Sequence, residues 1–241
     1  MKKLFLIISL LFFSISSRSQ VLMTLILGDK LNSDGLEFGL EGGINWTLIS
    51  NLETQTYANK FNLGFYFDIR VKKQWSIYTG TLVKANLGVD KLSRNDLKLL
   101  NVELYKNADN KEIEGVYSHK MNYFLVPILL KYKFKNHMYF ELGTQIGLMY
   151  KSWIEFNSDI DGKESIIKDY NKGEINNIDA GAMVGVGYKL LKGTGWTIGV
   201  KYYYGLVDVY KNMSGNKNSS IFLKLNIPVG AGEKPERKKN N

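Results

Sequence analysis

Between residues 61 and 71 the chain alternates two kinds of side chain without a break. The apolar members are Phe61, Leu63, Phe65, Phe67, Ile69 and Val71, and between them lie Asn62, Gly64, Tyr66, Asp68 and Arg70. Since successive side chains of a strand point to opposite faces, this pattern predicts a strand with one hydrocarbon face and one polar face. A half-buried strand of a soluble sandwich would also fit. The same pattern recurs along the chain behind an export-type segment, which favours a closed barrel whose apolar face meets lipid.

The chain begins with a segment typical of export. Lys2 and Lys3 precede an apolar run over residues 4–15, and the small residues Ser17 and Ser19 follow it. This order predicts a secretory signal peptide over residues 1–19. An uncleaved membrane anchor is the alternative, but the run is short beside the ~20 apolar residues that a spanning helix needs.

The remaining sequence predicts eight strands. They cover residues 35–48, 61–71, 75–87, 119–134, 138–150, 178–190, 196–206 and 219–229. The second, fourth and sixth strands are followed by tight turns, whereas the other connections are long, as in barrels with short periplasmic turns and long extracellular loops. We therefore predict an all-β fold, an eight-stranded antiparallel up-and-down transmembrane β-barrel over residues 35–229. Residues 20–34 would form a periplasmic N-terminal segment, and residues 230–241 a polar, basic periplasmic tail.

The distribution of charge predicts which face meets lipid. The expected lipid-facing positions carry no charge, and they include Phe38, Leu40, Phe65, Phe67, Phe140, Leu142, Val184, Val200 and Leu225. The opposite face carries an expected polar core in the lumen, namely Glu37, Glu41, Asp68, Arg70, Lys84, Glu141, Asp179, Lys201 and Lys224, with Lys131 and Lys189 on the same face. In the third strand this facing places Val83, Ala85 and Leu87 outward. A soluble lipocalin-like barrel would show the reverse arrangement.

Aromatic residues lie near the expected strand ends. Near the short turns they are Trp75, Tyr132, Tyr188 and Trp196, and near the long loops they are Trp46, Phe61, Tyr150 and Trp153. Two such bands are typical of the interfacial girdles of membrane barrels.

Two segments resemble a known family. Residues 123–132 read YFLVPILLKY and residues 38–45 read FGLEGGIN. Both resemble signature segments of the PorT-like outer-membrane β-barrels of Bacteroidetes. The resemblance implies an eight-stranded outer-membrane barrel and a link to protein secretion. The chain departs from the family pattern at Leu125, where an inward Glu is usual, and Pro127 suggests a bulge because it lacks a ladder donor.

The sequence offers no constellation typical of an enzyme. His119 lies beside Ser118 near the outer end of one strand, whereas His137 lies in a turn at the other end of the barrel. Adjacent strand residues point to opposite faces, so these groups cannot assemble a nucleophile and its base. We therefore expect no catalytic residues and no cofactor.

Two long loops contain further patterns. Residues 157–162 resemble the start of a calcium loop, but the twelfth position is Lys168 where a bidentate Glu is expected, so an ordinary turn is the better interpretation and no metal is expected. In the loop before the fourth strand, Leu92, Leu97 and Leu100 show a faint helical spacing. That loop either folds over the barrel mouth or moves in solvent.

Composition limits the partners. The formal net charge is +9, but the chain has no Arg-rich stripe, so nucleic acid is not an expected partner. The expected partners are outer-membrane lipid, the barrel-assembly machinery during insertion, and proteins that meet the extracellular loops. The expected function is non-enzymatic: a structural or protein-interaction role in the outer membrane. A small-molecule conduit is the alternative, although an eight-stranded lumen is just wide enough for side chains to fill, and Tyr66, Tyr78, Tyr139 and Tyr203 point into it.

Overall fold

The computed structural model describes residues 35–160 and 163–229. The predicted signal peptide, the N-terminal segment at residues 20–34 and the basic tail at residues 230–241 lie outside the described residues. Their assignments therefore stay predictions.

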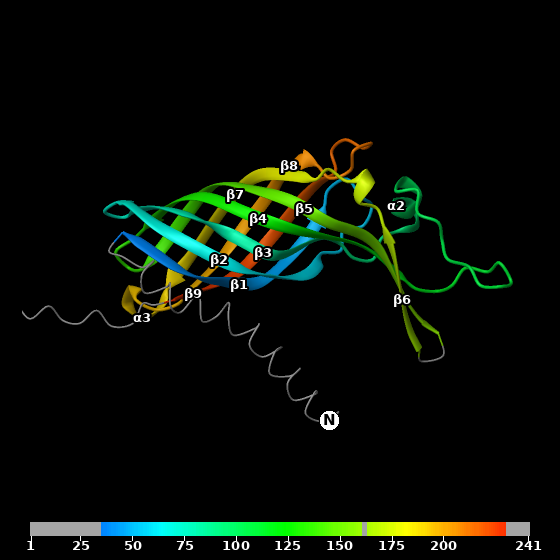
Figure 1. Ribbon diagram of the computed structural model, residues 1–241, viewed down its shortest axis with the longest axis horizontal. Helices are drawn as coiled ribbons and strands as arrows, with labels where there is room; N and C mark the ends of the chain where they lie inside the picture. The colour runs from blue at the N-terminus through cyan, green and yellow to red at the C-terminus, as the bar shows by residue number, and fades with distance from the viewer. Residues whose placement is uncertain (1–34, 161–162, 230–241) are drawn as a thin grey trace, which may run out of the picture.

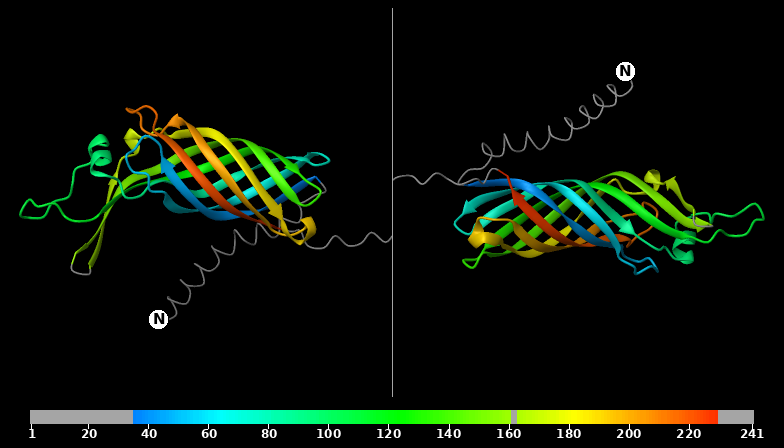
Figure 2. Two further views of the ribbon diagram at one scale, coloured as in Figure 1. Left: turned by 180° about the vertical axis from the view of Figure 1, so that it is seen from behind. Right: turned by 90° about the horizontal axis from the view of Figure 1, so that it is seen from below.

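The described chain forms a closed ring of antiparallel strands (Figures 1 and 2). The strands are β1 (Leu36–Ile49), β2 (Ala58–Lys72), β3 (Trp75–Val89), β4 (Val116–Lys133), β5 (Met138–Ile160), β6 (Lys163–Tyr170), β7 (Ile178–Lys189), β8 (Thr197–Asp208) and β9 (Lys217–Pro228). Each strand of the ring pairs with the next, β5 pairs with β7, and β1 pairs with β9 to close the sheet. Only β6 lies outside the ring, where it pairs with the far end of β5. The predicted eight-stranded barrel is therefore confirmed.

Three short helices complete the described chain. They are α2 (Arg94–Leu99), the 3-10 helix η1 (Lys172–Glu174) and α3 (Leu190–Gly193). None of the helices in the described ranges is long and apolar enough to cross a membrane.

The two ends of the barrel differ in the length of their connections. At one end β2 joins β3, β4 joins β5, and β7 joins β8 through a few residues, and we call this the short-turn end. At the opposite, long-loop end, α2 and the β5–β6 hairpin project beyond the ring (Figure 1). The alternation of short and long connections follows the prediction.

The alternation of side chains sets the inner and outer surfaces. Of the nine positions expected to face lipid, Leu40, Phe140, Leu142, Val184 and Val200 are exposed, and Phe65, Phe67 and Leu225 are half-buried. Phe38 pairs with Phe67 and shares its face, but it is only 8% exposed, and its ring centroid lies 5.0 Å from that of Phe67. Contact of this surface with lipid stays a prediction.

The half of β3 nearer the long-loop end differs from the predicted strand. Leu63 pairs with Lys84 whereas Gly64 pairs with Leu82, so Val83 is an extra residue in a β-bulge. A bulge places two residues against one and reverses the facing beyond it. Lys84 is consequently exposed on the outer surface, and Ala85 and Leu87 are buried inside. The assignment of Lys84 to the lumen, and of Ala85 and Leu87 to the outer face, is wrong for this reason.

Pro127 does not produce the suggested bulge. It pairs with Gln145 of β5 in an unbroken register, and the register with β3 is the same on both sides of it, from Thr79–Ile128 to Leu82–Leu125. The proline lacks an N–H donor but leaves the register unchanged.

The loop after the fifth predicted strand is largely sheet. β5 runs on to Ile160 and pairs with β6, so Asn157 lies opposite Ile166. The calcium-like segment therefore begins inside a strand, and within the described residues no group of three or more His, Asp or Glu could hold a metal ion. Residues 161–162, at the predicted turn, lie outside the described residues.

The loop between β3 and β4 folds over the mouth. α2 begins with a capping box in which Ser93 is the N-cap and Asp96 the reciprocal residue. Leu92 and Leu97 are buried in the hydrophobic cluster at the long-loop end, and Leu100 packs against it. Of the two alternatives for this loop, the structure therefore shows packing over the mouth for the segment around α2, whereas residues 106–112 are exposed.

Candidate functional site

The middle of the barrel is filled by buried ion pairs between strands that are not neighbours in the ring. Lys224 of β9 donates to Glu141 of β5, with 2.6 Å between Nζ and Oε1, and Lys201 of β8 donates to Glu41 of β1. All four side chains are at most 2% exposed. Lys131 of β4 pairs with Asp68 of β2 at 3.0 Å. The strands of the ring are therefore connected by side-chain ion pairs as well as by backbone hydrogen bonds.

Tyr78 lies among these charges. Its hydroxyl donates to Glu41 and accepts from Asn226 Nδ2 at 2.8 Å. Its ring stacks on Tyr66 with 5.6 Å between centroids, and the ammonium groups of Lys131 and Lys224 lie 5.0 Å and 4.1 Å from its centroid. Cation–π contacts of this kind stabilise a desolvated ammonium. Tyr78 therefore links several buried cations and carboxylates into one packed polar core.

A second polar layer lies nearer the long-loop end. Asp179 accepts a hydrogen bond from Asn218 Nδ2 at 3.0 Å, and Asn62 donates to Asn45 at 3.2 Å. Asp179 and the amide side chains are buried. Amide side chains both donate and accept, so they continue the polar core with little further charge.

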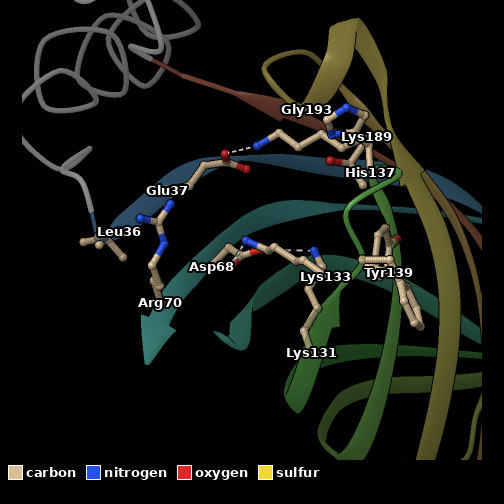
Figure 3. Close-up of a pocket in the computed structure, with 13 residues that line it drawn as sticks. Leu36, Glu37, Asp68, Arg70, Lys131, Lys133, His137, Tyr139, Lys189 and Gly193 are labelled. Carbon is tan, nitrogen blue, oxygen red and sulfur yellow. Dashed lines mark hydrogen bonds and ion pairs between the residues drawn. The ribbon is translucent and has the colours of Figure 1, made fainter. Parts of the chain in front are cut away.

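The short-turn mouth contains a cavity of about 230 Å³ (Figure 3). Lys189 donates to Glu37, and Lys133 to Asp68 at 2.7 Å between Nζ and Oδ1, across this cavity. Arg70, expected in the lumen, is exposed at its rim. Its inner wall includes the buried Asp68–Lys131 pair and Tyr139. The cavity therefore ends on the packed core.

The long-loop mouth is covered by apolar side chains. Tyr117 of β4 and Phe156 of β5 pack with 4.6 Å between ring centroids, and Tyr105 of the intervening loop lies 4.9 Å from Phe156. Leu92 and Leu97 belong to the same cluster. The loops thus cover the polar core with a hydrophobic cap.

A buried polar network lies under this cap. His119 Nε2 lies 2.9 Å from Ser152 Oγ, and His119 Nδ1 lies 2.9 Å from Tyr210 OH. Ser152 donates to Asn171 Oδ1 at 2.7 Å. As expected for neighbouring residues of a strand, His119 does not contact Ser118, and its serine partner is Ser152 on the neighbouring strand, which the sequence did not reveal. His119 and Ser152 are buried, so the network joins β4 to the loops around it.

Asp96 fastens α2 to the loop between β1 and β2. Its carboxylate accepts from the backbone N–H of Glu53 at 2.8 Å, from that of Thr54 at 3.0 Å and from Thr54 Oγ1 at 2.6 Å. Burial opposes ionisation, but the hydrogen bond from Thr54 and the backbone donors outweigh it, so the pKa of Asp96 lies below its usual value. The ionised carboxylate therefore holds the two loops together.

Replacing Asp96 by Asn should release this contact. The amide keeps the shape but accepts fewer hydrogen bonds, at a local cost of about 1–3 kcal/mol. Hydrogen exchange at the amides of Glu53 and Thr54 should accelerate, whereas Asp109→Asn, in an exposed part of the same loop, should leave it unchanged. Folding lowers the pKa of Asp96, so the contribution of this carboxylate to stability depends on pH. It is complete above about pH 3.9, the ordinary pKa of Asp, and declines as the pH falls through the lowered pKa. Exchange that stays slow in Asp96→Asn would contradict this role.

The structure brings together most of the residues predicted for the polar core. Glu41, Asp68, Glu141, Asp179, Lys201 and Lys224 are buried inside the ring, and Glu37 is half-buried at the short-turn mouth. Lys84 is outside, and Arg70 is at the rim. Sequence reasoning missed Lys133 and the His119 network, because their partners come from strands or loops far away in the chain.

Comparisons with known proteins agree with this architecture. The family described as "Outer membrane protein beta-barrel domain" matches residues 20–211. A comparison with curated proteins found no match.

Several solved structures are similar in outline. Ail, the attachment invasion locus protein of Yersinia pestis, is 10% identical with a TM-score of 0.39, and the match covers 81% of this chain and 99% of that one. Neisserial surface protein A is 11% identical with a TM-score of 0.39, covering 80% and 97%. OprG from Pseudomonas aeruginosa is 12% identical with a TM-score of 0.33, covering 80% and 93%. At these scores the likenesses carry no argument about function.

Proposed function

Since this chain belongs to the outer membrane protein β-barrel domain family and is located in the outer membrane, we propose that it is a closed, non-enzymatic scaffold that presents its long loops to protein partners. The observation that carries the proposal is the filled lumen. Lys224–Glu141 and Lys201–Glu41 lie inside it with almost no exposure, and the ring of Tyr78 lies close to both lysines. A small-molecule conduit would have to break these buried pairs, and doing so costs several kcal/mol for each charge left without its partner.

The long-loop end offers the surface for a partner. The β5–β6 hairpin projects beyond the ring (Figure 2), and β6 carries the exposed side chains Ile166, Ile167 and Tyr170. Among the described strands, β6 pairs with β5 alone, so its other edge is open. An open strand edge with exposed apolar side chains can pair with an added strand of another protein.

Two features support a non-enzymatic role. His119 and Ser152 are within hydrogen-bonding distance, but both are buried, and neither lines the cavity at the short-turn mouth or the two cavities among the long loops around Leu97 and around Lys120. His137 lies at the short-turn mouth. A nucleophile and base that substrate cannot reach do not form an active site.

The resemblance of residues 38–45 and 123–132 to PorT-like barrels of Bacteroidetes supports a finer assignment. On that basis the partner at the long loops would belong to a protein-secretion apparatus, and the barrel-assembly machinery would act on the chain during insertion. Function does not follow from fold alone, so this step rests on the resemblance.

We expect the refolded protein to give no reproducible single-channel steps in planar bilayers. The same preparation should show heat-modifiable gel mobility, because a closed barrel resists unfolding in detergent until it is boiled. Regular conductance steps would contradict the closed scaffold and favour the conduit.

Cross-linking in intact outer membranes tests the partner surface. A partner that is cross-linked to the wild type should be lost when Ile166 is replaced by Lys. Leu99→Lys, at an exposed position of α2, is the matched control and should keep the partner.

A further inference from the structure

Two β-bulges turn two lysines out of the barrel at the long-loop end. On β3 the extra residue Val83 reverses the facing of Lys84. On β5, Met149 pairs with Tyr123 whereas Lys151 pairs with Asn122, so Tyr150 is the extra residue and the facing of Lys151 is reversed. Both lysines would point into the lumen if the strands were regular, and both are exposed.

The two lysines lie on either side of β4 at a similar height. Ala85, next to Lys84, pairs with Tyr123, and Lys151 pairs with Asn122. Phe124 is exposed between the two neighbouring strands, and its ring centroid lies 4.7 Å from that of Tyr150. The lysines therefore flank a common aromatic surface on the outside of the ring.

Aromatic rings also accompany each ammonium group. Lys84 Nζ lies 5.9 Å from the centroid of Phe61, and Lys151 Nζ lies 5.1 Å and 5.5 Å from those of Tyr170 and Trp153. Within the described ranges, neither ammonium group forms an ion pair with a carboxylate. Their positive charges are thus uncompensated by the protein.

We propose that Lys84 and Lys151, with Phe61, Phe124 and Tyr150, form a binding surface for the phosphate headgroups of anionic membrane lipid. The rings lie beside the acyl chains at the level of the interface. The two ammonium groups extend from the flanks of this surface, Lys84 near Phe61 of β2 and Lys151 near Tyr170 of β6, where anionic headgroups surround the barrel. Without the bulges, β3 and β5 would point the ammonium groups of Lys84 and Lys151 into the lumen. The bulges instead place them where lipid headgroups meet the barrel. The site requires only the barrel and its membrane location, so it is independent of the closed-scaffold proposal.

The test is lipid retention. Wild type and the double variant Lys84→Gln/Lys151→Gln are reconstituted in phosphatidylcholine vesicles that contain a minor fraction of phosphatidylglycerol. The barrels are extracted in mild detergent, and bound lipid is counted by native mass spectrometry. The wild type should retain phosphatidylglycerol over phosphatidylcholine, and each lysine removed should lower that preference about fivefold. Lys98→Gln/Lys106→Gln, which removes two exposed loop charges, is the matched control and should retain the preference.

A charge-preserving variant and a competing anion complete the test. Lys84→Arg/Lys151→Arg should keep the preference because it keeps both charges. The single variants Lys84→Gln and Lys151→Gln replace the double Gln variant if heat-modifiable mobility shows that the double variant has not folded. Inorganic phosphate, added as a competitor, should not displace the lipid. Equal lipid retention in wild type and the Gln variant, loss of the preference in the folded Arg variant, or complete displacement by inorganic phosphate would each overturn the proposal.

Discussion

Replacing Lys224 by Met should lower the free energy of unfolding by about 3–5 kcal/mol, because it leaves a charge without its partner in the barrel interior. Lys224 Nζ lies 2.6 Å from Glu141 Oε1, and neither side chain is exposed. Met keeps much of the aliphatic stem of Lys, so packing against Tyr78 and Tyr139 changes little while the Glu141 carboxylate loses its counter-charge. The expected loss is electrostatic, and it acts on the polar core that the proposed function requires.

The measurement is a urea titration in lipid vesicles, with the folded fraction read from heat-modifiable mobility. The double variant Lys224→Met/Glu141→Leu should recover most of the loss, since removing both charges removes the unpaired one. Lys189→Met is the matched control: its pair with Glu37 is 19% and 25% exposed, so the loss should be about 1 kcal/mol or less. If Lys224→Met costs no more than Lys189→Met, the lumen is hydrated and the closed scaffold is wrong.

Much of the fold could be predicted because membrane barrels obey a strict local rule. With a period of two and lipid on one side, each strand reveals its facing through its own residues, as Phe61 to Val71 do on β2. The same rule located the buried positions of Glu41, Glu141 and Lys201. It did not reveal which acid pairs with which base, because Lys201 reaches Glu41 across 160 residues of sequence.

The failures arise where the local rule is interrupted. The bulge at Val83 leaves no signature in the residue types, since Val83, Lys84 and Ala85 fit a regular strand equally well, and one extra residue is enough to turn Lys84 outward. The β5–β6 hairpin did leave a signal. Asp161 and Gly162 form a hairpin-type dipeptide between two segments, and the sequence predicts an ordinary turn there but not the strands on either side of it. In both cases the pairing between strands, rather than the local sequence alone, determines the structure.

Replacing Phe65 by Arg should destabilise the barrel in bilayers by about 2–4 kcal/mol, because it places a charge on the outer face at the middle of β2. β2 runs from Ala58 to Lys72, so Phe65 is the central residue of the strand. Its ring also packs on Phe38 and Phe67, with centroids 6.3 Å and 6.2 Å away. Phe65→Ala therefore measures the packing loss alone, and the difference between the two variants isolates the cost of the charge in lipid.

Val71→Arg provides the depth control near the end of the same strand. Val71 is exposed near the short-turn end, where the bilayer interface lowers the cost of an Arg to about 0–1 kcal/mol. Urea titrations of Phe65→Arg, Phe65→Ala and Val71→Arg in phosphatidylcholine vesicles should thus rank the Phe65→Arg barrel as the least stable. The same titration in detergent micelles should narrow the difference, since a micelle adapts to a buried charge more readily than a bilayer does. Equal stability of the two Arg variants in vesicles would mean that this face does not meet the hydrocarbon core, and the assignment of Phe65, Phe67 and their neighbours to lipid would fail.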